Sequence, residues 1–404
     1  MKVAVYHNLP SGGGKRALYE MTRRLAARHT IDVYTLSCAE HDFCDLQPFA
    51  QRHVVTPFKP LPLARWPFGR INQGLRTLTL IRVHRLQQQI ARQIDAAGYD
   101  VVFTHNCQFI QSPSVLTFLR TPSVYYCGEP PRLIYEPRIA RPYDSLTRQQ
   151  RAVNLIDPFP ALYRTVLARL DRKNVRAATC VLANSAYTRE SLYRAYGIFA
   201  HIGFLGVDAE RFRPLALPRE NFIVSVGMIN PQKGFDFLIC SLALLEKARR
   251  PLLMIICNSA DERERAYLTA LAQQLQVAVE FRSLIPDEEL VRLYNQARLT
   301  VYAPVMEPFG FVPLESMACQ TPVIGVREGG VRESITTGVT GLLVDREPEA
   351  MAAAIHLLLN NSAEADRLGH NGRSSVEEQW TWANSIKVIE HYLADAAEST
   401  SRGL

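Results

Sequence analysis

The chain has 404 residues, of which 47% are apolar and 21% charged, so it can bury large cores and lacks the composition of a disordered or fibrous protein. No stretch approaches 18 uninterrupted apolar residues, and the first residues run directly into a strand-like segment, which indicates a soluble protein that is not exported. Its eight cysteines form no C-x-x-C pair, which argues against a zinc site or disulfide scaffold and favours reduced thiols in the cytosol.

Apolar runs typical of strands alternate with segments of helical periodicity, which is the pattern of parallel α/β sheets. In the first half we predict strands near Val3–Tyr6, Ile31–Thr35, Val101–Thr104, Ser123–Tyr126 and Cys180–Ala183, with helices at Lys15–Arg28 and Leu75–Ala97. In the second half we predict strands near Phe222–Val226, Leu252–Ile256, Val277–Phe281, Leu299–Ala303, Pro322–Gly325 and Gly341–Val344, and a last helix over Thr381–Ala397.

The two series of strands meet around Gly203–Pro218, where two prolines interrupt the pattern and the charge balance changes sign. Residues 1–205 contain 27 basic and 13 acidic residues, whereas residues 206–404 contain 19 and 26. We therefore predict an N-terminal domain over 1–203, a C-terminal domain over 204–380 and a helical segment over 381–404 that packs back on the first domain. Two such sheets would place their ligand crevices on either side of a cleft.

The basic excess of the first half is concentrated between Leu46 and Ile94, a stretch with eight bases and no acid. A solvated helix face is the ordinary explanation of such a run. Apolar residues interleave with the arginines here, however, as in an amphipathic segment that rests on anionic headgroups. Nucleic acid is the competing polyanion, but no zinc-finger or RNP-type signature is found. The interleaved apolar residues are Trp66, Phe68, Leu75, Leu78, Leu80 and Ile81.

Two glycine-containing segments come between a predicted strand and a helix, where backbone N–H groups and the helix dipole favour anions. The first is Ser11-Gly12-Gly13-Gly14-Lys15, which has neither P-loop nor dinucleotide spacing, so a tight turn is an equally good explanation. The second runs from Val226 to Gly234. Lys233 is placed there to meet a phosphate, with helix punctuation as the alternative.

The most informative segment is Glu307-Pro308-Phe309-Gly310-Phe311-Val312-Pro313-Leu314-Glu315. Pro313 suits the first turn of a helix, so the preceding N–H groups would face an anion between two carboxylates. Either glutamate alone would be explained by the helix dipole, but the pair is harder to explain in that way. A weaker loop is Tyr126-Cys127-Gly128-Glu129-Pro130-Pro131-Arg132, in which Glu129 and Arg132 would face the cleft.

Taken together, these segments resemble the retaining glycosyltransferases of family 4, which have the α/β GT-B fold of two Rossmann-like domains facing a central cleft. The resemblance is strongest from Phe222 to Asp345, and it includes no D-x-D metal motif. It rests on the E-x7-E element of Glu307 and Glu315, on Asn184-Ser185, Gly206-Val207-Asp208, Lys233-Gly234 and the segment from Glu328 to Glu333.

This resemblance implies that the second domain binds a nucleotide diphosphate sugar as co-substrate, that the first binds the acceptor, and that no metal or cofactor takes part. Lys233 would neutralise the diphosphate, Glu315 would bind the ribose and Glu307 would position the donor sugar. The implied catalytic residues are Glu307, Lys233 and Glu129; the donor-binding residues are Gly13, Gly14, Gly227, Met228, Lys233, Phe309, Gly310, Phe311, Val312 and Glu315; and the acceptor or cleft residues are Gly128, Arg132 and Asn184.

Two departures from the family pattern matter, and a third, Gln320 where the family usually has Gly, is a lesser change. Met228 stands where relatives commonly have Arg, and Gly128 stands where they often have a His that contacts the donor sugar. The resemblance still predicts a retaining, metal-independent hexosyltransferase that acts on a lipid-linked or polysaccharide acceptor. A catalytically silent nucleotide-sugar-binding module is the alternative, as is another GT-B enzyme such as a nucleotide-sugar 2-epimerase or a phosphorylase.

The loop around Glu129 is similar to that of bacterial surface-polysaccharide mannosyltransferases, which favours GDP-mannose over UDP-linked donors. We expect a cytoplasmic protein with peripheral contact at the inner face of an anionic membrane, and no nucleic-acid partner.

Overall fold

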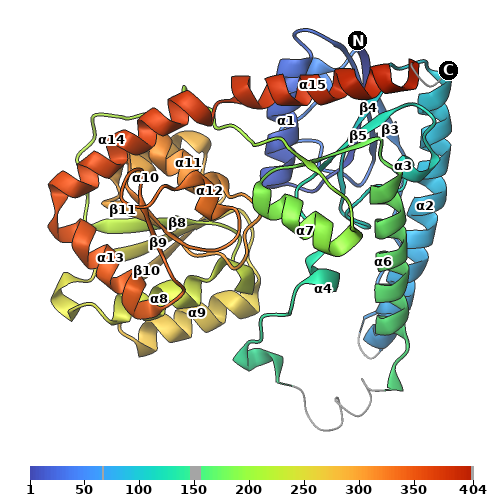
Figure 1. Cartoon of the computed structure of the whole chain (residues 1–404). Helices are drawn as coiled ribbons and strands as arrows, with labels where there is room; N and C mark the ends of the chain where they lie inside the picture. The colour runs from blue at the N-terminus through green and yellow to red at the C-terminus, as the bar shows by residue number, and fades with distance from the viewer. Residues whose placement is uncertain (66–67, 146–155, 402–404) are drawn as a thin grey trace. The chain divides into compact units, whose positions relative to one another are not determined.

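The computed structural model describes residues 1–65, 68–145 and 156–401, and forms two compact α/β units, each built on one parallel sheet (Figure 1). The first unit comprises Met1–Arg138, Ser145–Phe204 and Ser385–Leu404. The second comprises Ile139–Asp144 and Leu205–Asn384, so it is assembled from two separate stretches of chain. The sequence had placed residues 139–144 in the N-terminal domain.

The first unit contains a seven-stranded sheet of order β3-β2-β1-β4-β5-β6-β7. The order reverses between β1 and β4, which is where open α/β sheets bind ligands beyond the strand carboxyl ends. The strands are β1 (Lys2–Asn8), β2 (Thr30–Leu36), β3 (Arg52–Thr56), β4 (Val101–Cys107), β5 (Ser123–Cys127), β6 (Cys180–Ala183) and β7 (His201–Ile202).

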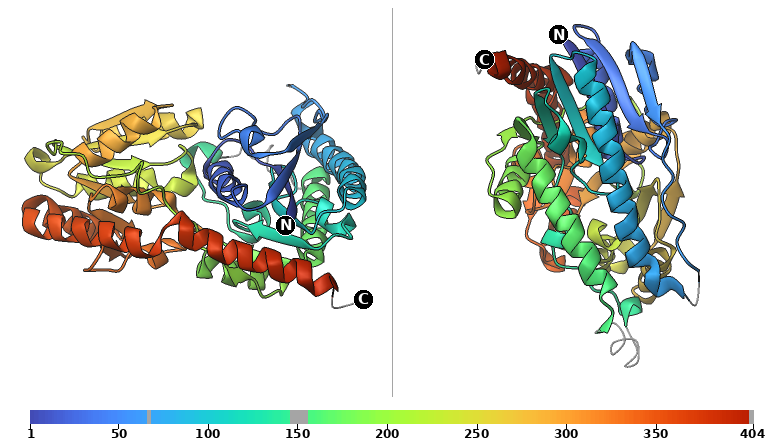
Figure 2. Two further views of the ribbon diagram at one scale, coloured as in Figure 1. Left: turned by 90° about the horizontal axis from the view of Figure 1, so that it is seen from above. Right: turned by 90° about the vertical axis from the view of Figure 1, so that its right-hand side faces the viewer.

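Helices cover this sheet, and the two longest of its connecting helices, α2 (Asn72–Ala96) and α6 (Phe159–Ala177), lie side by side (Figures 1 and 2). The predicted helix at Lys15–Arg28 begins at Gly13 and ends at Leu25, and that at Leu75–Ala97 begins three residues earlier, at Asn72. The other helices of the unit are α1 (Gly13–Leu25), α3 (Val115–Phe118), α4 (Arg132–Tyr135), α7 (Ala186–Tyr196) and most of α15 (Trp382–Ser401), with short 3₁₀ turns at Gln47–Phe49 and Phe68–Ile71.

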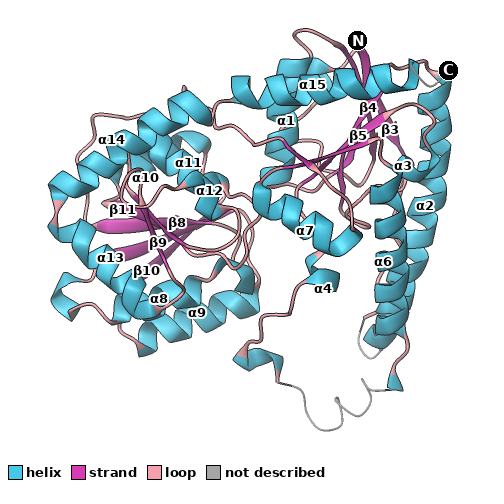
Figure 3. Cartoon of the chain, in the orientation of Figure 1, coloured by secondary structure: helices cyan, strands magenta, loops and turns pink. Residues whose placement is uncertain are grey.

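The second unit contains a six-stranded sheet of order β10-β9-β8-β11-β12-β13, flanked by helices (Figure 3). Its strands are β8 (Phe222–Val226), β9 (Leu252–Cys257), β10 (Val279–Ser283), β11 (Leu299–Tyr302), β12 (Val323–Val326) and β13 (Leu342–Val344). Its helices are α8 (Phe235–Ala243), α9 (Glu262–Gln274), α10 (Asp287–Gln296), α11 (Phe311–Ala318), α12 (Val331–Ser334), α13 (Pro348–Asn360) and α14 (Ser362–Gln379), with 3₁₀ turns η3 (Pro142–Asp144), η4 (Pro231–Lys233) and η5 (Lys247–Arg249).

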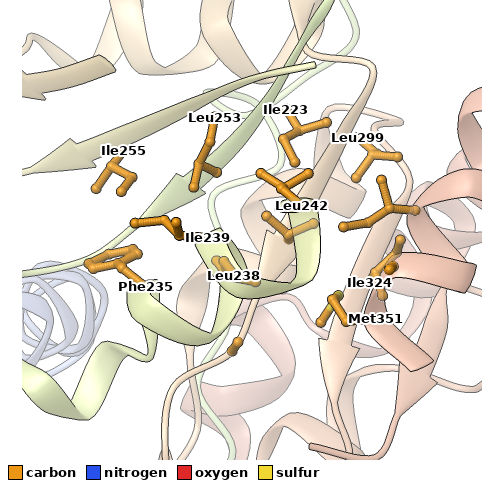
Figure 4. Packing of buried hydrophobic residues seen from close by; sticks show 14 of the residues in the cluster. Ile223, Phe235, Leu238, Ile239, Leu242, Leu253, Ile255, Leu299, Ile324 and Met351 are labelled. Atoms are coloured by element: carbon orange, nitrogen blue, oxygen red, sulfur yellow. The ribbon is translucent and has the colours of Figure 1, made fainter. Parts of the chain in front are cut away.

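The core of the second unit lies between this sheet and α8. Ile223, Leu253 and Leu299 project from three neighbouring strands and are fully buried (Figure 4). Phe235 and Leu238 of α8 pack against them. Since both faces of the sheet are covered, the strands need continuous apolar runs rather than alternation, and this is the pattern that the sequence shows.

The short stretch Ile139–Asp144 is bound to the second unit through Arg141. Its guanidinium forms ion pairs with Asp236 at 2.7 Å and with Glu264 at 2.9 Å, and its side chain is only 7% exposed. Tyr143 also donates a hydrogen bond to Glu264. Glu264 is fully buried, so these partners satisfy a carboxylate that water does not reach.

Residues of α15 from Ser385 onward group with the first unit. Glu390 accepts hydrogen bonds from Arg28 at 2.9 Å and His29 at 3.2 Å, and the ring of Tyr392 stacks on that of His201. Among the residues that the structure describes, no helix carries an apolar stretch long enough to cross a bilayer.

Candidate functional site

Two motif loops of the second unit meet in an ion pair. Lys233 Nζ lies 2.8 Å from Glu307 Oε2, and the two side chains are 20% and 17% exposed. Lys233 follows β8 and Glu307 follows β11, and these strands are neighbours in the sheet. The pair therefore lies at the carboxyl edge of the sheet, where the ammonium is held in place but is still reached by solvent.

The two loops approach each other because Gly234 has no side chain. Its φ is +64°, and a Cβ there would lie 2.2 Å from the carbonyl oxygen of Ala303 at the end of β11. Val305 N–H also donates to Gln232 O at 2.7 Å. The close contact between the two loops thus explains why a glycine follows Lys233 in the sequence.

The loop that carries Glu307 is supported from its other side by the glycines after β12. Gly330 N–H donates to Glu307 O at 2.8 Å, and a Cβ on Gly330 would lie 2.1 Å from Pro308 O. A Cβ on Gly329 would lie 2.2 Å from Glu307 O. The Glu-Gly-Gly segment therefore holds the backbone of Glu307.

Glu315 lies inside α11 and is 7% exposed. Tyr294, a fully buried residue of α10, donates a hydrogen bond of 2.9 Å to Glu315 Oε2. Burial, together with the nearby Glu315 carboxylate, raises the pKa of Tyr294 well above its ordinary value, so the phenol stays protonated and donates. One oxygen of Glu315 is thereby oriented from within the protein.

The start of α11 has the form expected of an anion site. Gly310 is its N-cap and provides no side-chain cap, so backbone N–H groups point out of the helix start. Phe309 and Val312 are buried, and Phe309 packs against Phe311 and Trp380. These residues would therefore contribute backbone rather than side chains to a ligand.

Gly227 and Met228 lie between β8 and η4. A Cβ on Gly227 would lie 3.1 Å from Lys233 Cδ, so the glycine leaves room for the lysine stem. Met228, which the family resemblance marks as a departure, is 47% exposed.

Arg346 organises the same edge of the sheet, although no sequence motif marks it. It donates to Glu328 at 2.8 and 2.7 Å, to Ala303 O at 3.0 Å and to Pro304 O at 2.8 Å. The guanidinium thus links the ends of β11 and β12. It lies just after β13, and only the folded sheet brings it to these partners.

In the first unit, Gly128 follows β5 and lies beside two amides at the ends of β4 and β6, the strands on either side of β5. A Cβ on Gly128 would lie 3.6 Å from Asn106 Nδ2 and 3.9 Å from Asn184 Nδ2. Asn184 is 6% exposed, and its Oδ1 is a buried acceptor without a hydrogen-bond partner among the described residues. Such an acceptor is a suitable place for a ligand hydroxyl or amide. Sequence reasoning missed Asn106.

Glu129 and Arg132, which we predicted from the sequence to face the cleft, form an ion pair with each other. Arg132 Nε donates to Glu129 Oε2 at 2.6 Å, and Arg132 also lies 3.2 Å from Glu136. In this arrangement the carboxylate of Glu129 is already neutralised by its neighbour.

Gly13 and Gly14 form the first turn of α1, a helix with no capping side chain and no acid in its first turn. Lys15 turns inward, is 2% exposed and has its Nζ 3.5 Å from His7 Nε2. Burial lowers the pKa of Lys15 to about 8, with a smaller opposing effect from Asp45. Sequence reasoning did not predict that this lysine is buried.

The predicted residues thus fall into two groups. Those from Gly227 to Glu315 gather at the carboxyl edge of the second sheet, and Gly13, Gly14, Gly128, Glu129, Arg132 and Asn184 belong to the first unit. In the described part of the chain, no three His, Cys, Asp or Glu side chains are placed to hold a metal ion.

Comparison with known proteins gives matches along most of the chain. Residues 11–211 match the model of the Glycosyltransferase Family 4, and residues 207–375 match that of the Glycosyl transferases group 1. An uncharacterized glycosyltransferase of Methanocaldococcus jannaschii is 33% identical over 187 residues, which cover 45% of this chain and about half, 47%, of that relative. A D-inositol 3-phosphate glycosyltransferase of Acidothermus cellulolyticus is 27% identical over 418 residues, which cover 96% of this chain and 86% of that protein.

Solved structures share this fold along nearly the whole chain. Sucrose-phosphate synthase of Thermosynechococcus elongatus superposes with a TM-score of 0.70 at 21% identity, covering 97% of this chain and 98% of that one. HepE of Anabaena, solved with UDP and glucose, gives a TM-score of 0.69 at 18% identity, covering 98% and 99%. These likenesses confirm the predicted α/β fold of two parallel-sheet, Rossmann-like domains.

Proposed function

The chain belongs to glycosyltransferase family 4, group 1, and on that premise we propose that it moves a hexose from a nucleotide diphosphate sugar to a glycan or lipid-linked glycan acceptor, with retention and without a metal. The observation that carries this proposal is the arrangement at the second sheet. The Lys233–Glu307 pair joins two neighbouring loops at one carboxyl edge, and the oriented Glu315 lies in α11, directly after the second loop. A cation, a helix start and two carboxylates suit a ligand that combines phosphates with hydroxyl groups.

In the proposed reaction the bond between the anomeric carbon and the diphosphate oxygen breaks, and negative charge develops on the diphosphate. Lys233 and the N–H groups at the start of α11 stabilise that charge as fixed donors that need no reorganisation. Glu315 binds the ribose hydroxyls, and Glu307 binds a hydroxyl of the donor sugar. The acceptor hydroxyl attacks the same face, and the departing phosphate oxygen takes its proton, so the configuration is retained.

We propose GDP-mannose as the donor, because the loop around Glu129 is similar to that of bacterial surface-polysaccharide mannosyltransferases. A UDP-sugar is the alternative. The structurally similar HepE was solved with UDP and with UDP-glucose, which supports testing UDP-linked donors in parallel. We place the reaction in the cytoplasm, at the inner face of an anionic membrane.

The experiment is a thermal-shift panel of GDP, UDP and ADP and their sugar conjugates, followed by chromatography of the free sugar released by slow donor hydrolysis. A ligand at a hundred times its Kd adds roughly 2.7 kcal/mol of apparent stability. Glu315→Ala should lose both the shift and the hydrolysis, whereas Glu378→Ala, an exposed control on α14, should keep both. Normal hydrolysis by Glu315→Ala would refute the site.

A second candidate is a module that binds nucleotide sugars without turnover. It is favoured by the exposed Met228, which provides no second positive charge beside Lys233, and by Gly128, which has no side chain where the family resemblance leads us to expect an imidazole. A donor-induced thermal shift with no release of sugar, over days and in the presence of acceptor extracts, would select this candidate over the enzyme.

A further inference from the structure

The first unit contains a basic pocket that the proposed sugar transfer does not use. It has a volume of about 530 Å³ and lies between the ends of two strands and α2. Ser37 follows β2, and Phe58 and Lys59 follow β3, while Arg82, Arg85 and Gln89 project from α2.

The charge around this pocket has one sign. Lys59, Arg82 and Arg85 are exposed, and the described residues that line the pocket include no Asp or Glu. Within the described residues none of these three cations has a carboxylate at ion-pair distance, in contrast to Arg52 nearby, which is paired with Asp32 at 2.9 Å. Three like charges around one hollow favour a ligand with a concentrated negative charge, such as a phosphate.

The walls of the pocket are held in place before any ligand arrives. The guanidinium of Arg82 lies over the ring of Phe58, with its central carbon 5.6 Å from the ring centroid. Ser37 Oγ accepts from Phe58 N–H at 2.9 Å and donates to Phe58 O at 3.1 Å, which fixes the loop that carries Lys59. A cation fixed in this way loses little entropy on binding.

Apolar side chains continue the same face of α2. Leu78 and Ile81 are 52% and 36% exposed, and they precede Arg82 and Arg85, respectively, by four residues, about one turn of the helix. Of the other apolar residues that the sequence singled out, Leu80 is buried and Leu75 is half-buried, whereas Trp66 and the side chain of Phe68 lie outside the described residues. The outer face of α2 thus carries both the cations of the pocket and exposed apolar side chains.

We propose that this pocket binds the phosphate of an anionic lipid, with Lys59, Arg82 and Arg85 around the phosphate and with Leu78 and Ile81 against the acyl chains. The inference assigns residues to the membrane contact of the proposed function, but it is independent of sugar transfer because binding is measured without donor. The cations supply electrostatic attraction, and the apolar pair distinguishes a lipid from a soluble phosphate.

The test is sedimentation of the full chain with vesicles of phosphatidylcholine containing one quarter phosphatidylglycerol, against pure phosphatidylcholine. Wild type should bind the anionic vesicles only, and less as salt rises. Attraction of about 1 kcal/mol per base corresponds to roughly fivefold in the partition coefficient. The triple variant Lys59→Gln, Arg82→Gln, Arg85→Gln should therefore bind on the order of 100-fold more weakly.

The matched control is the triple variant Lys247→Gln, Arg292→Gln, Lys387→Gln, which removes the same charge from exposed positions outside the pocket. If both triple variants lost the same vesicle affinity, binding would depend on net charge alone, and the assignment of the pocket would be wrong. Leu78→Gln should weaken vesicle binding without changing its salt dependence, and an unchanged affinity in that variant would refute the apolar contact.

Two further experiments distinguish a lipid phosphate from a soluble phosphate or a nucleic acid as the ligand of the pocket. Inorganic phosphate at millimolar concentration should compete only weakly with the vesicles. Complete displacement by it, or by a mixed-sequence RNA at equal charge, would overturn the lipid assignment. The pocket variant should also keep the wild-type thermal shift with the donor nucleotide, so that a failure of the donor site is recognised separately.

Discussion

The buried phenol of Tyr294 donates a hydrogen bond of 2.9 Å to Glu315 Oε2. The two residues are 21 positions apart and come from α10 and α11. If Glu315 binds ribose, Tyr294 is a positioning residue that selects which carboxylate oxygen faces the ligand.

We predict that Tyr294→Phe raises the donor KM by roughly tenfold and changes kcat much less, because the chemistry at the anomeric carbon is untouched. The unmade bond should also cost about 1–3 kcal/mol of folding free energy. Steady-state kinetics and urea unfolding measure the two effects. Tyr196→Phe is the control, since Tyr196 is a buried phenol bound to Asp171 in the first unit. It should lose stability but keep the donor KM, and a similar KM change in both would argue against positioning.

Lys233→Gln and Glu307→Gln should each lower kcat by about 10²–10³, because each removes a fixed charge from the proposed reacting centre. Their effect on stability should be small, since a partly exposed ion pair contributes about 0–1 kcal/mol. Donor hydrolysis and thermal unfolding of the two variants and of the double variant test this. Arg211→Gln breaks a more exposed pair with Asp287 in the same unit and should keep full activity. If Lys233→Gln turned over normally, the diphosphate role would be wrong.

Met228→Arg should lower the donor KM by about tenfold, because the residue is 47% exposed beside Gly227 and a long cation can be added there without repacking a core. Met228→Gln has a similar shape without charge and is the comparison. The measurement is the donor KM at low and moderate salt, since an added charge contact should weaken with ionic strength. An equal gain in the Gln variant would indicate packing rather than charge.

Gly234→Ala should destabilise the second unit by several kcal/mol, because a Cβ would lie 2.2 Å from Ala303 O and φ is +64°. Gly338→Ala shares a positive φ, +74°, but meets nothing within 4 Å, so it should cost only about 1–2 kcal/mol. Urea unfolding compares the two. Similar losses would mean that the loop shifts away from Ala303 at little cost.

Lys15→Met should stabilise the protein at pH 7 by about 2 kcal/mol and by much less at pH 10. The pKa of Lys15 is lowered to about 8 in the folded chain, below its value in the unfolded chain. The unfolded state therefore holds more protons between pH 8 and about 10.4, and wild-type stability rises with pH in that window. The exposed Lys387→Met should show no such trend, and a constant difference for Lys15→Met across the range would contradict a buried ammonium.

The strands were predictable where both faces are buried. Phe222–Val226 was predicted to the residue, because every position is apolar or small and lies under helices. The strand predicted at Val277–Phe281 begins instead at Val279, because Gln276 has a positive φ and Val277 is buried before the strand. β3 and β7 were not predicted. They are the two outer strands of their sheet and are only partly buried, so their sequences carry a weak apolar signal.

The candidate site was predictable where its geometry depends on glycine. The close contacts at Gly234 and Gly330 need residues without side chains, and such positions are visible in a sequence. Tyr294 and Arg346 were not predictable, because their partners lie 21 and 43 residues away and no local pattern links them.

The docking of Arg141 has a consequence for how the two halves can be recombined. A chimera joined between Phe204 and Leu205 would combine the second unit with residues 139–144 of another protein. The buried carboxylate of Glu264 would then have an ion-pair partner only if the residue at position 141 of that protein were also a cation. An unmatched carboxylate in that position costs about 3–5 kcal/mol. Exchanges of donor specificity between relatives should therefore transplant this six-residue stretch along with the C-terminal half.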